Sequence, residues 1–191
     1  LRARNMEEYL KRIANSLERA FPPDPDSNYF EKAGAFIWEP AQNYFSQVSD
    51  ISTVDISLLK GMDEEIEQVT FNTEAFIEGK LANNVLVWGA RGMGKSTLIK
   101  SVVKTASSKS NNLKIIEVSR DDIGQVDKLL KLIKNINKKF IIFCDDISFD
   151  DNETSYKSLK SVLDGGLIGG MQNVLVYATS NRRHLLSRKA G

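Results

Sequence analysis

The sequence predicts an α/β fold in which a parallel sheet lies between two layers of helices, preceded by a helical arm. A glycine-rich loop at 89–97 joins a short apolar segment to a stretch whose apolar residues have helical spacing. A second apolar run, at 140–144, ends in two aspartates. Further apolar runs alternate with helix-like stretches, which is typical of parallel strands connected by helices.

The loop matches the phosphate-binding pattern G-x-x-x-x-G-K-[ST], known as the P-loop or Walker A motif. We expect the whole loop to bind nucleotide: Gly89, Ala90, Arg91, Gly92, Met93, Gly94, Lys95, Ser96 and Thr97. Backbone N–H groups at a helix N-terminus attract anions, and glycine lets the backbone approach them closely. Lys95 would reach the β and γ phosphates, and the Ser96 hydroxyl would ligate Mg²⁺. A chance glycine-rich turn is the alternative, and the flanking strand and helix disfavour it.

Bulk properties exclude several classes of protein. The chain has 191 residues, enough for one ordinary domain with an appended segment. Its formal net charge of +1 gives no global attraction to nucleic acid or anionic membrane. The single cysteine, Cys144, excludes an intramolecular disulfide and fits a reducing compartment. No apolar run approaches the about 20 residues that span a bilayer, and no signal-peptide core follows the charged N-terminal residues. We therefore expect a cytoplasmic protein without a membrane span.

The N-terminal part predicts a separate arm. Residues 5–21 have the spacing of an amphipathic helix, and the prolines after it mark a boundary. Residues 26–57 are rich in aromatic side chains, which either stack on bases or pack between the arm and the core. Packing is the commoner role, and we expect it here. We therefore divide the chain into an N-terminal extension at 1–54 and a nucleotide-binding core at 55–191.

The core begins with a turn at 58–62 and a helix that Asp63 caps and Gly79 ends. After the P-loop helix we expect a strand at 113–118 and then a helix with apolar residues from 126 to 136. That helix also carries four lysines one turn apart: Lys128, Lys131, Lys134 and Lys138. A stripe that binds nucleic acid is one interpretation. A solvated face opposite an apolar one is commoner, and we expect that.

The apolar run at 140–144 predicts a central strand that is buried on both faces. Asp145 and Asp146 follow at its carboxyl end, where open α/β sheets bind ligands, and together they form a Walker B element. We expect Asp145 to hold Mg²⁺ and Asp146 to polarise the attacking water. We expect Cys144 to be a small buried apolar residue rather than a nucleophile.

The remaining stretch predicts a helix at 153–163, a glycine-bearing loop and a fourth strand at 174–178. Polar residues at the end of this strand, from Thr179 to His184, again face the predicted nucleotide edge. His184 is the only histidine, so we expect it to have a surface or packing role.

This order of elements resembles the core of the AAA+ ATPases. Three segments look like a bacterial AAA+ family of unassigned biological role: 83–92, 143–149 and 178–184. The likeness covers roughly residues 55–187. It implies that the turn from Leu59 to Asp63 borders the adenine, and that Asn181 is the sensor-1 residue, which reads the γ-phosphate. The catalytic set would then be Lys95, Asp146 and Asn181.

The chain differs from the usual AAA+ pattern in two ways. Many AAA+ proteins have Glu where this chain has Asp146, and the shorter side chain predicts either slow hydrolysis or a repositioned water. The printed sequence ends at Gly191, before the fifth core strand, the arginine finger and the lid with its sensor-2 arginine. Arg182 and Arg183 are not at the usual finger position. We therefore expect this chain to bind nucleotide but to hydrolyse it poorly.

The leading interpretation is Mg²⁺-dependent ATP hydrolysis coupled to conformational change or to remodelling of an unknown protein or nucleic-acid partner. It includes a homo-oligomer in the full-length protein. The alternative is an ATP-dependent switch or loader with negligible hydrolysis, in which Asp146 is structural. A small-molecule kinase is disfavoured because no additional substrate pocket or arginine-rich lid is recognisable.

Overall fold

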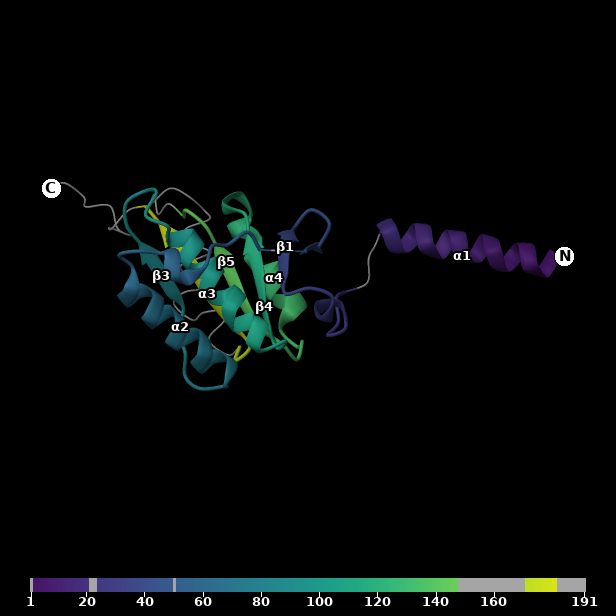
Figure 1. The fold of residues 1–191 in the computed structure, drawn as a ribbon. Coiled ribbons are helices and arrows are strands. Elements are labelled where there is room, and N and C mark those ends of the chain that lie inside the picture. Colours follow the sequence, from purple (N-terminus) through teal and green to yellow (C-terminus); the bar gives the residue numbers. More distant parts are fainter. Residues whose placement is uncertain (1, 21–23, 50, 148–170, 182–191) are drawn as a thin grey trace.

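A six-stranded sheet forms the centre of the computed structural model, with helices on both of its faces (Figure 1). The structure describes residues 2–20, 24–49, 51–147 and 171–181. The helix expected at 153–163 and the residues Arg182, Arg183 and His184 lie outside this part of the chain. The α/β class and the layered arrangement expected from the sequence are confirmed.

The strands are β1 (Ala35–Glu39), β2 (Tyr44–Val48), β3 (Val85–Trp88), β4 (Leu113–Val118), β5 (Lys139–Cys144) and β6 (Val174–Ser180). The α-helices are α1 (Arg2–Ala20), α2 (Asp63–Ile77), α3 (Lys95–Lys109) and α4 (Val126–Ile133). Short 3₁₀ helices occupy Tyr29–Glu31, Ile56–Leu58 and Arg120–Gln125. The core elements therefore follow the predicted order, although Asp63 is the first residue of α2 and Met62 is its N-cap.

The strand order is β2-β1-β4-β5-β6-β3. Every neighbouring pair is parallel except β1 and β2, which form an antiparallel hairpin at one edge. The register aligns the carboxyl ends of the strands that matter for the site. Trp88 of β3 lies opposite Ser180 of β6, and Cys144 of β5 lies opposite Ala178 of β6. The residues that follow these three strands therefore emerge at one edge of the sheet.

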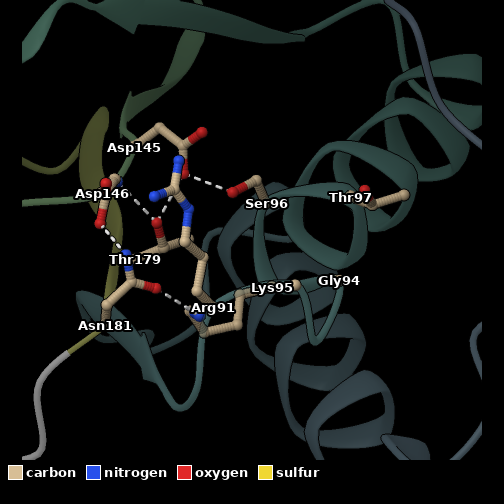
Figure 2. Close-up of a pocket in the computed structure, with 10 residues that line it drawn as sticks. Arg91, Gly94, Lys95, Ser96, Thr97, Asp145, Asp146, Thr179 and Asn181 are labelled. Atoms are coloured by element: carbon tan, nitrogen blue, oxygen red, sulfur yellow. Dashed lines mark hydrogen bonds between the residues drawn. The ribbon is translucent and has the colours of Figure 1, made fainter.

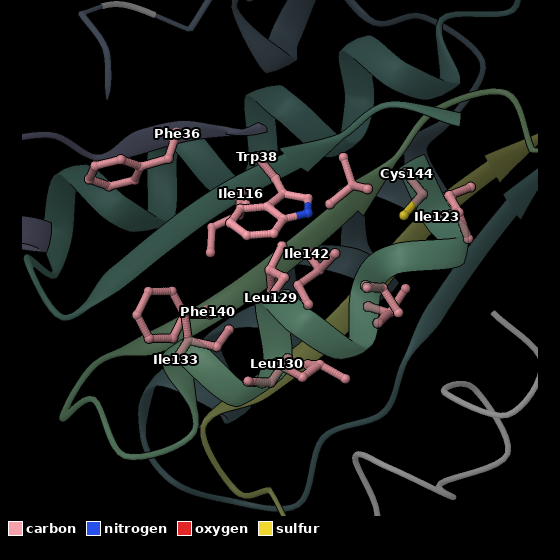
Figure 3. Close-up of a cluster of buried hydrophobic side chains, with 14 of the residues drawn as sticks. Phe36, Trp38, Ile116, Ile123, Leu129, Leu130, Ile133, Phe140, Ile142 and Cys144 are labelled. Atoms are coloured by element: carbon pink, nitrogen blue, oxygen red, sulfur yellow. The ribbon is translucent and has the colours of Figure 1, made fainter. Parts of the chain in front are cut away.

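Strand β5 is buried on both faces, as its continuous apolar run predicted. Because successive side chains of a strand point to opposite faces, the run supplies both halves of the core. Phe140, Ile142 and Cys144 pack in the cluster that α4 covers (Figure 3). Ile141 and Phe143 pack in the other cluster, beneath α2 and α3. Burial raises the pKa of the Cys144 thiol to about 12, which fits the small apolar role expected for it.

The sequence predicted a separate helical and aromatic extension at 1–54, but the structure differs. Strands β1 and β2 belong to the same sheet as β3, the strand before the P-loop. The sheet therefore begins at residue 35, upstream of the division predicted at residue 55. The aromatic residues do pack, as expected, but their neighbours are the sheet and each other rather than the arm. Phe30 packs edge-on against Phe36 and Phe140, with ring centroids 5.0 and 4.9 Å apart.

Helix α1 forms close to where the sequence predicted it, and it extends away from the sheet (Figure 1). The side chains at 5–18 are all exposed, including the apolar face of the helix. None of the described helices combines the length and the apolar character needed to span a bilayer.

The lysines of the α4 region do not form one continuous stripe. Lys128, Lys131 and Lys134 are exposed, as expected for a solvated face. Lys138 instead donates to the Glu31 carboxylate, and so connects the loop before β5 to the 3₁₀ helix before β1. This ion pair lowers the pKa of Glu31, chiefly through the hydrogen bond from Lys138.

Candidate functional site

The glycine-rich loop joins the end of β3 to the start of α3, as the sequence predicted. Gly92 has a φ of 82° and Gly94 a φ of 88°, in the left-handed region that favours glycine. Gly94 is the N-cap of α3, and its carbonyl oxygen accepts the first helical hydrogen bond, from Leu98 N at 2.8 Å. The loop therefore turns its backbone so that the N-terminus of α3 faces the edge of the sheet.

Lys95 is nearly buried, with 6% of its surface exposed. Its Nζ donates to the carbonyl oxygens of Gly89 and Ala90, at 2.9 and 2.8 Å. A third hydrogen bond, of 2.9 Å, reaches Oδ1 of Asn181 at the end of β6. These three bonds account for the three donors of an ammonium group, so the position of the charge is tightly defined.

Asp145 faces the start of α3. Its Oδ1 accepts hydrogen bonds from Ser96 Oγ and from Thr179 Oγ1, the latter at 2.6 Å. A hydroxyl and a carboxylate oxygen that lie together at a helix N-terminus are ligands suited to Mg²⁺, which usually completes its shell with water and phosphate oxygens. Among the described residues there is no cluster of three or more His, Cys, Asp or Glu that could hold a metal by itself. Ser96 and Asp145 therefore fit a metal that is bound together with a phosphate.

The side chain of Asp146 points in a different direction from that of Asp145, because the backbone of Asp146 is in the left-handed region, with φ of 49°. Asp tolerates this region better than most residues. The backbone N–H of Asp146 donates to Thr179 Oγ1 at 2.8 Å, and its Oδ1 accepts a hydrogen bond from Asn181 Nδ2. The side chains of the two adjacent aspartates thus have different partners across the cavity, Ser96 for Asp145 and Asn181 for Asp146 (Figure 2).

Thr179 connects the two aspartates, and the sequence patterns assigned it no specific role. It is 1% exposed, accepts from the Asp146 backbone and donates to the Asp145 carboxylate. Its carbonyl oxygen also accepts from Ile147 N at 2.9 Å. The register of β5 against β6 is the signal that could have identified Thr179. Because Ala178 lies opposite Cys144, the residues that follow them, Thr179 and Asp145, lie next to each other.

These residues line one cavity of about 400 Å³, within the usual size of small-molecule sites (Figure 2). Its lining consists of Arg91, Gly92, Gly94, Lys95, Ser96, Thr97, Asp145, Asp146, Thr179 and Asn181. Gly89, Ala90 and Met93 instead line a second cavity of about 710 Å³ between β3 and α2. The structure therefore brings together most, but not all, of the predicted nucleotide-binding loop with the predicted metal and catalytic residues.

The turn before α2 lies against the loop. A Cβ built on Gly94 would be 3.6 Å from Cδ2 of Leu59 and 3.9 Å from Sδ of Met62. The turn that the AAA+ resemblance assigned to the adenine is thus adjacent to the start of α3.

Helix α2 is held to β6 by a buried polar network around Tyr177. Asn72 Nδ2 donates to the Tyr177 hydroxyl at 2.9 Å, and Thr73 Oγ1 lies 2.8 Å from the same oxygen. Burial raises the pKa of Tyr177. Because Tyr177 precedes Thr179 by two residues, this network supports the strand that carries the site.

We expect Tyr177→Phe to destabilise the protein by about 1–3 kcal/mol, because it removes the hydrogen bonds that Asn72 and Thr73 make with the buried hydroxyl. Denaturant unfolding measures this loss. Tyr9→Phe is the matched control, since Tyr9 is 57% exposed on α1. A Tyr177→Phe variant that unfolds at the same denaturant concentration as the wild type would show that the network contributes nothing.

Several solved structures are similar to this chain, and the likeness to the first described here shows the fold. The Aeropyrum pernix ORC1 protein, solved in complex with DNA, matches at TM-score 0.52 and 14% identity, over 68% of this chain and 43% of that one. AMPPCP-bound DnaA from Aquifex aeolicus matches at TM-score 0.46 and 20% identity, over 64% of this chain and 39% of that one. The Thermotoga maritima RuvB Holliday junction branch migration motor matches at TM-score 0.42 and 19% identity, over 67% of this chain and 41% of that one.

The chain thus spans about two fifths of the length of these structures, which are AAA+ proteins. No curated protein matches it. One family model, described as "Protein of unknown function (DUF815)", matches residues 31–191. The chain has the AAA+ type of P-loop fold and belongs to the DUF815 family.

Proposed function

We propose that this chain binds ATP with Mg²⁺ and hydrolyses it, and that hydrolysis drives a conformational change that remodels a partner. The observation that carries the proposal is the convergence of three strand ends on one cavity. Lys95 at the start of α3, the aspartates after β5 and Asn181 after β6 are connected there by hydrogen bonds. A cytoplasmic location, a homo-oligomeric full-length protein and a protein or nucleic-acid client belong to the same proposal.

The phosphates would lie over the N-terminus of α3, where backbone N–H groups and the helix dipole favour anions. Lys95 would place its charge at the β and γ phosphates. Ser96 and Asp145 would hold Mg²⁺, which neutralises phosphate charge and fixes the phosphate geometry. Leu59 and Met62 would border the adenine.

In the hydrolytic step, an oxygen of water forms a bond to the γ-phosphorus as the bond to the β–γ bridging oxygen breaks. The proton that leaves the water passes to the Asp146 carboxylate, and ADP and phosphate are the products. Asn181 would orient the water and the terminal phosphate, because its amide already bonds both Lys95 and Asp146. One Asp146 oxygen accepts from Asn181, so the other is the base in this scheme.

The same hydrogen bond favours a second candidate, an ATP-dependent switch or loader with negligible hydrolysis. In that case Asp146 has a structural role, which is to hold Asn181 in place. Phosphate release followed over hours, in the wild type and in Asp145→Asn, distinguishes the two candidates. Release by the wild type that the variant lacks supports the ATPase, whereas wild-type release no faster than that of the variant supports the switch.

Asp145→Asn should weaken Mg²⁺-dependent nucleotide binding by at least the about 10- to 100-fold that loss of an outer-shell partner of a metal ligand costs, because it removes a charge from the metal shell itself. The asparagine retains Oδ1, so Ser96 and Thr179 keep their acceptor and the fold should persist. Titration of ATP with and without Mg²⁺ measures the effect. An equal affinity of the variant and the wild type in Mg²⁺ would contradict the metal assignment.

A further inference from the structure

Arg91 lines the same cavity as Lys95 and both aspartates. Figure 2 shows its side chain extending away from the loop, and Asp145 and Thr179 line the same cavity. The residue is exposed, and within the described part of the chain its side chain forms no hydrogen bond or ion pair. Lys95, by contrast, already has three acceptors. Of the two cations in the described lining, the protein therefore holds one in place and leaves the other available to a ligand.

The charges on the cavity wall indicate a role for Arg91, the second cation. Asp145 and Asp146 contribute two negative charges, and Lys95 alone would leave the wall with a net negative charge. Such a wall repels the anionic end of a nucleotide. Arg91 brings the formal charge of the titratable side chains in the lining to zero, so that a bound divalent cation makes the site attractive to phosphate.

The position of Arg91 in the loop indicates which phosphate it would contact. Lys95 Nζ bonds the carbonyl oxygen of Ala90, the residue immediately before Arg91. The guanidinium therefore extends from a peptide next to the lysine charge and lines the cavity that the two aspartates also line. Guanidinium groups bind phosphate oxygens with two parallel hydrogen bonds, which an ammonium group cannot do.

We propose that Arg91 binds the terminal phosphate of the nucleotide from within its own chain, so that the loop itself distinguishes a nucleoside triphosphate from a diphosphate. This inference rests on the proposed function. It adds that the triphosphate is selected by a second cation of the loop, four residues before Lys95.

The test compares ATP and ADP affinity, each with Mg²⁺, in the wild type, Arg91→Gln and Arg91→Lys. Arg91→Gln should weaken ATP binding by about 10- to 100-fold and ADP binding by less than about threefold, since the charge-assisted bonds go to the γ-phosphate. Arg91→Lys should recover part of the loss, because it restores the charge without the two-pronged geometry. Arg12→Gln is the matched control on exposed α1, and it should change neither affinity.

An unchanged ratio of ATP to ADP affinity in Arg91→Gln would overturn the inference, whether both affinities fell or neither did. A wild type that bound neither nucleotide would overturn the proposed function instead. A mixture of Arg91→Gln and Lys95→Ala subunits tests whether Arg91 acts within its own chain. Recovery of ATP binding in the mixture would overturn the in-chain assignment, and no recovery is the expected result. Thermal unfolding of each variant shows whether it is folded.

Discussion

Asp146→Asn is expected to abolish most ATP turnover while ATP binding stays within a few-fold of the wild type. General-base groups typically contribute about 10²–10⁴ in rate, and asparagine cannot take a proton from water. The substitution should preserve local geometry for two reasons. Asparagine also tolerates the left-handed backbone at this position, and its Oδ1 can still accept from Asn181. Phosphate release at saturating ATP measures the loss.

The control for this prediction is Asp127→Asn on the exposed side of α4, which removes an equal charge from a residue that does not line the cavity. A loss of binding in Asp146→Asn as large as that in Asp145→Asn would mean that both carboxylates serve the metal. If Asp146→Asn hydrolysed ATP as fast as the wild type, Asp146 would not be the base, and its role would be structural.

Lys95→Ala is expected to weaken ATP binding by about 10- to 100-fold, equivalent to about 1.5–3 kcal/mol for a charge-assisted contact. The lysine side chain points toward loop carbonyl oxygens and Asn181 rather than into either apolar cluster. The fold should therefore survive the substitution. Titration of ATP, with circular dichroism to confirm the fold, measures the effect.

Lys109→Ala provides the comparison, because Lys109 lies at the opposite end of α3 and its side chain is 68% exposed. Unchanged ATP affinity in Lys95→Ala, with the fold intact, would remove the main support for the phosphate site.

Strong local patterns explain why much of the core was predictable. The loop before α3 combines glycines with a strand on one side and helical spacing on the other, and β5 is one uninterrupted apolar run. The hairpin of β1 and β2 lacks such a pattern. Its strands have only five residues each, and burial in β1 does not alternate, because Phe36 and Ala35 are both buried. Its turn contains Asn43 at φ of 48° where the commonest hairpin signal is glycine.

The sequence indicated most residues of the candidate site and the edge of the sheet at which they lie, but it did not show how Thr179 connects them. The patterns predicted Lys95, Ser96 and the aspartates, because each follows a recognisable element. They assigned Thr179 no role, because its importance depends on the pairing of β5 with β6, which are about thirty residues apart in sequence. They also offered no reason for Asp in place of the usual Glu at 146. The left-handed backbone there supplies one, since Asp is enriched in that conformation and Glu is not.

The position of β6 between β3 and β5 has a mechanical consequence. Gly89 N bonds the carbonyl oxygen of Ser180, and Ile147 N bonds that of Thr179, so two consecutive peptides of β6 hold the first residue of the loop and the residue after the aspartates. The distance between the loop that carries Lys95 and the segment that carries the two aspartates is therefore set by the width of β6. This strand lies about 4.8 Å from its neighbour on each side. A shift of the end of β6 would move both walls of the cavity at once. Conversely, we expect a ligand that draws those walls together to displace the end of β6 and so to act on β3 and β5, the strands paired with it.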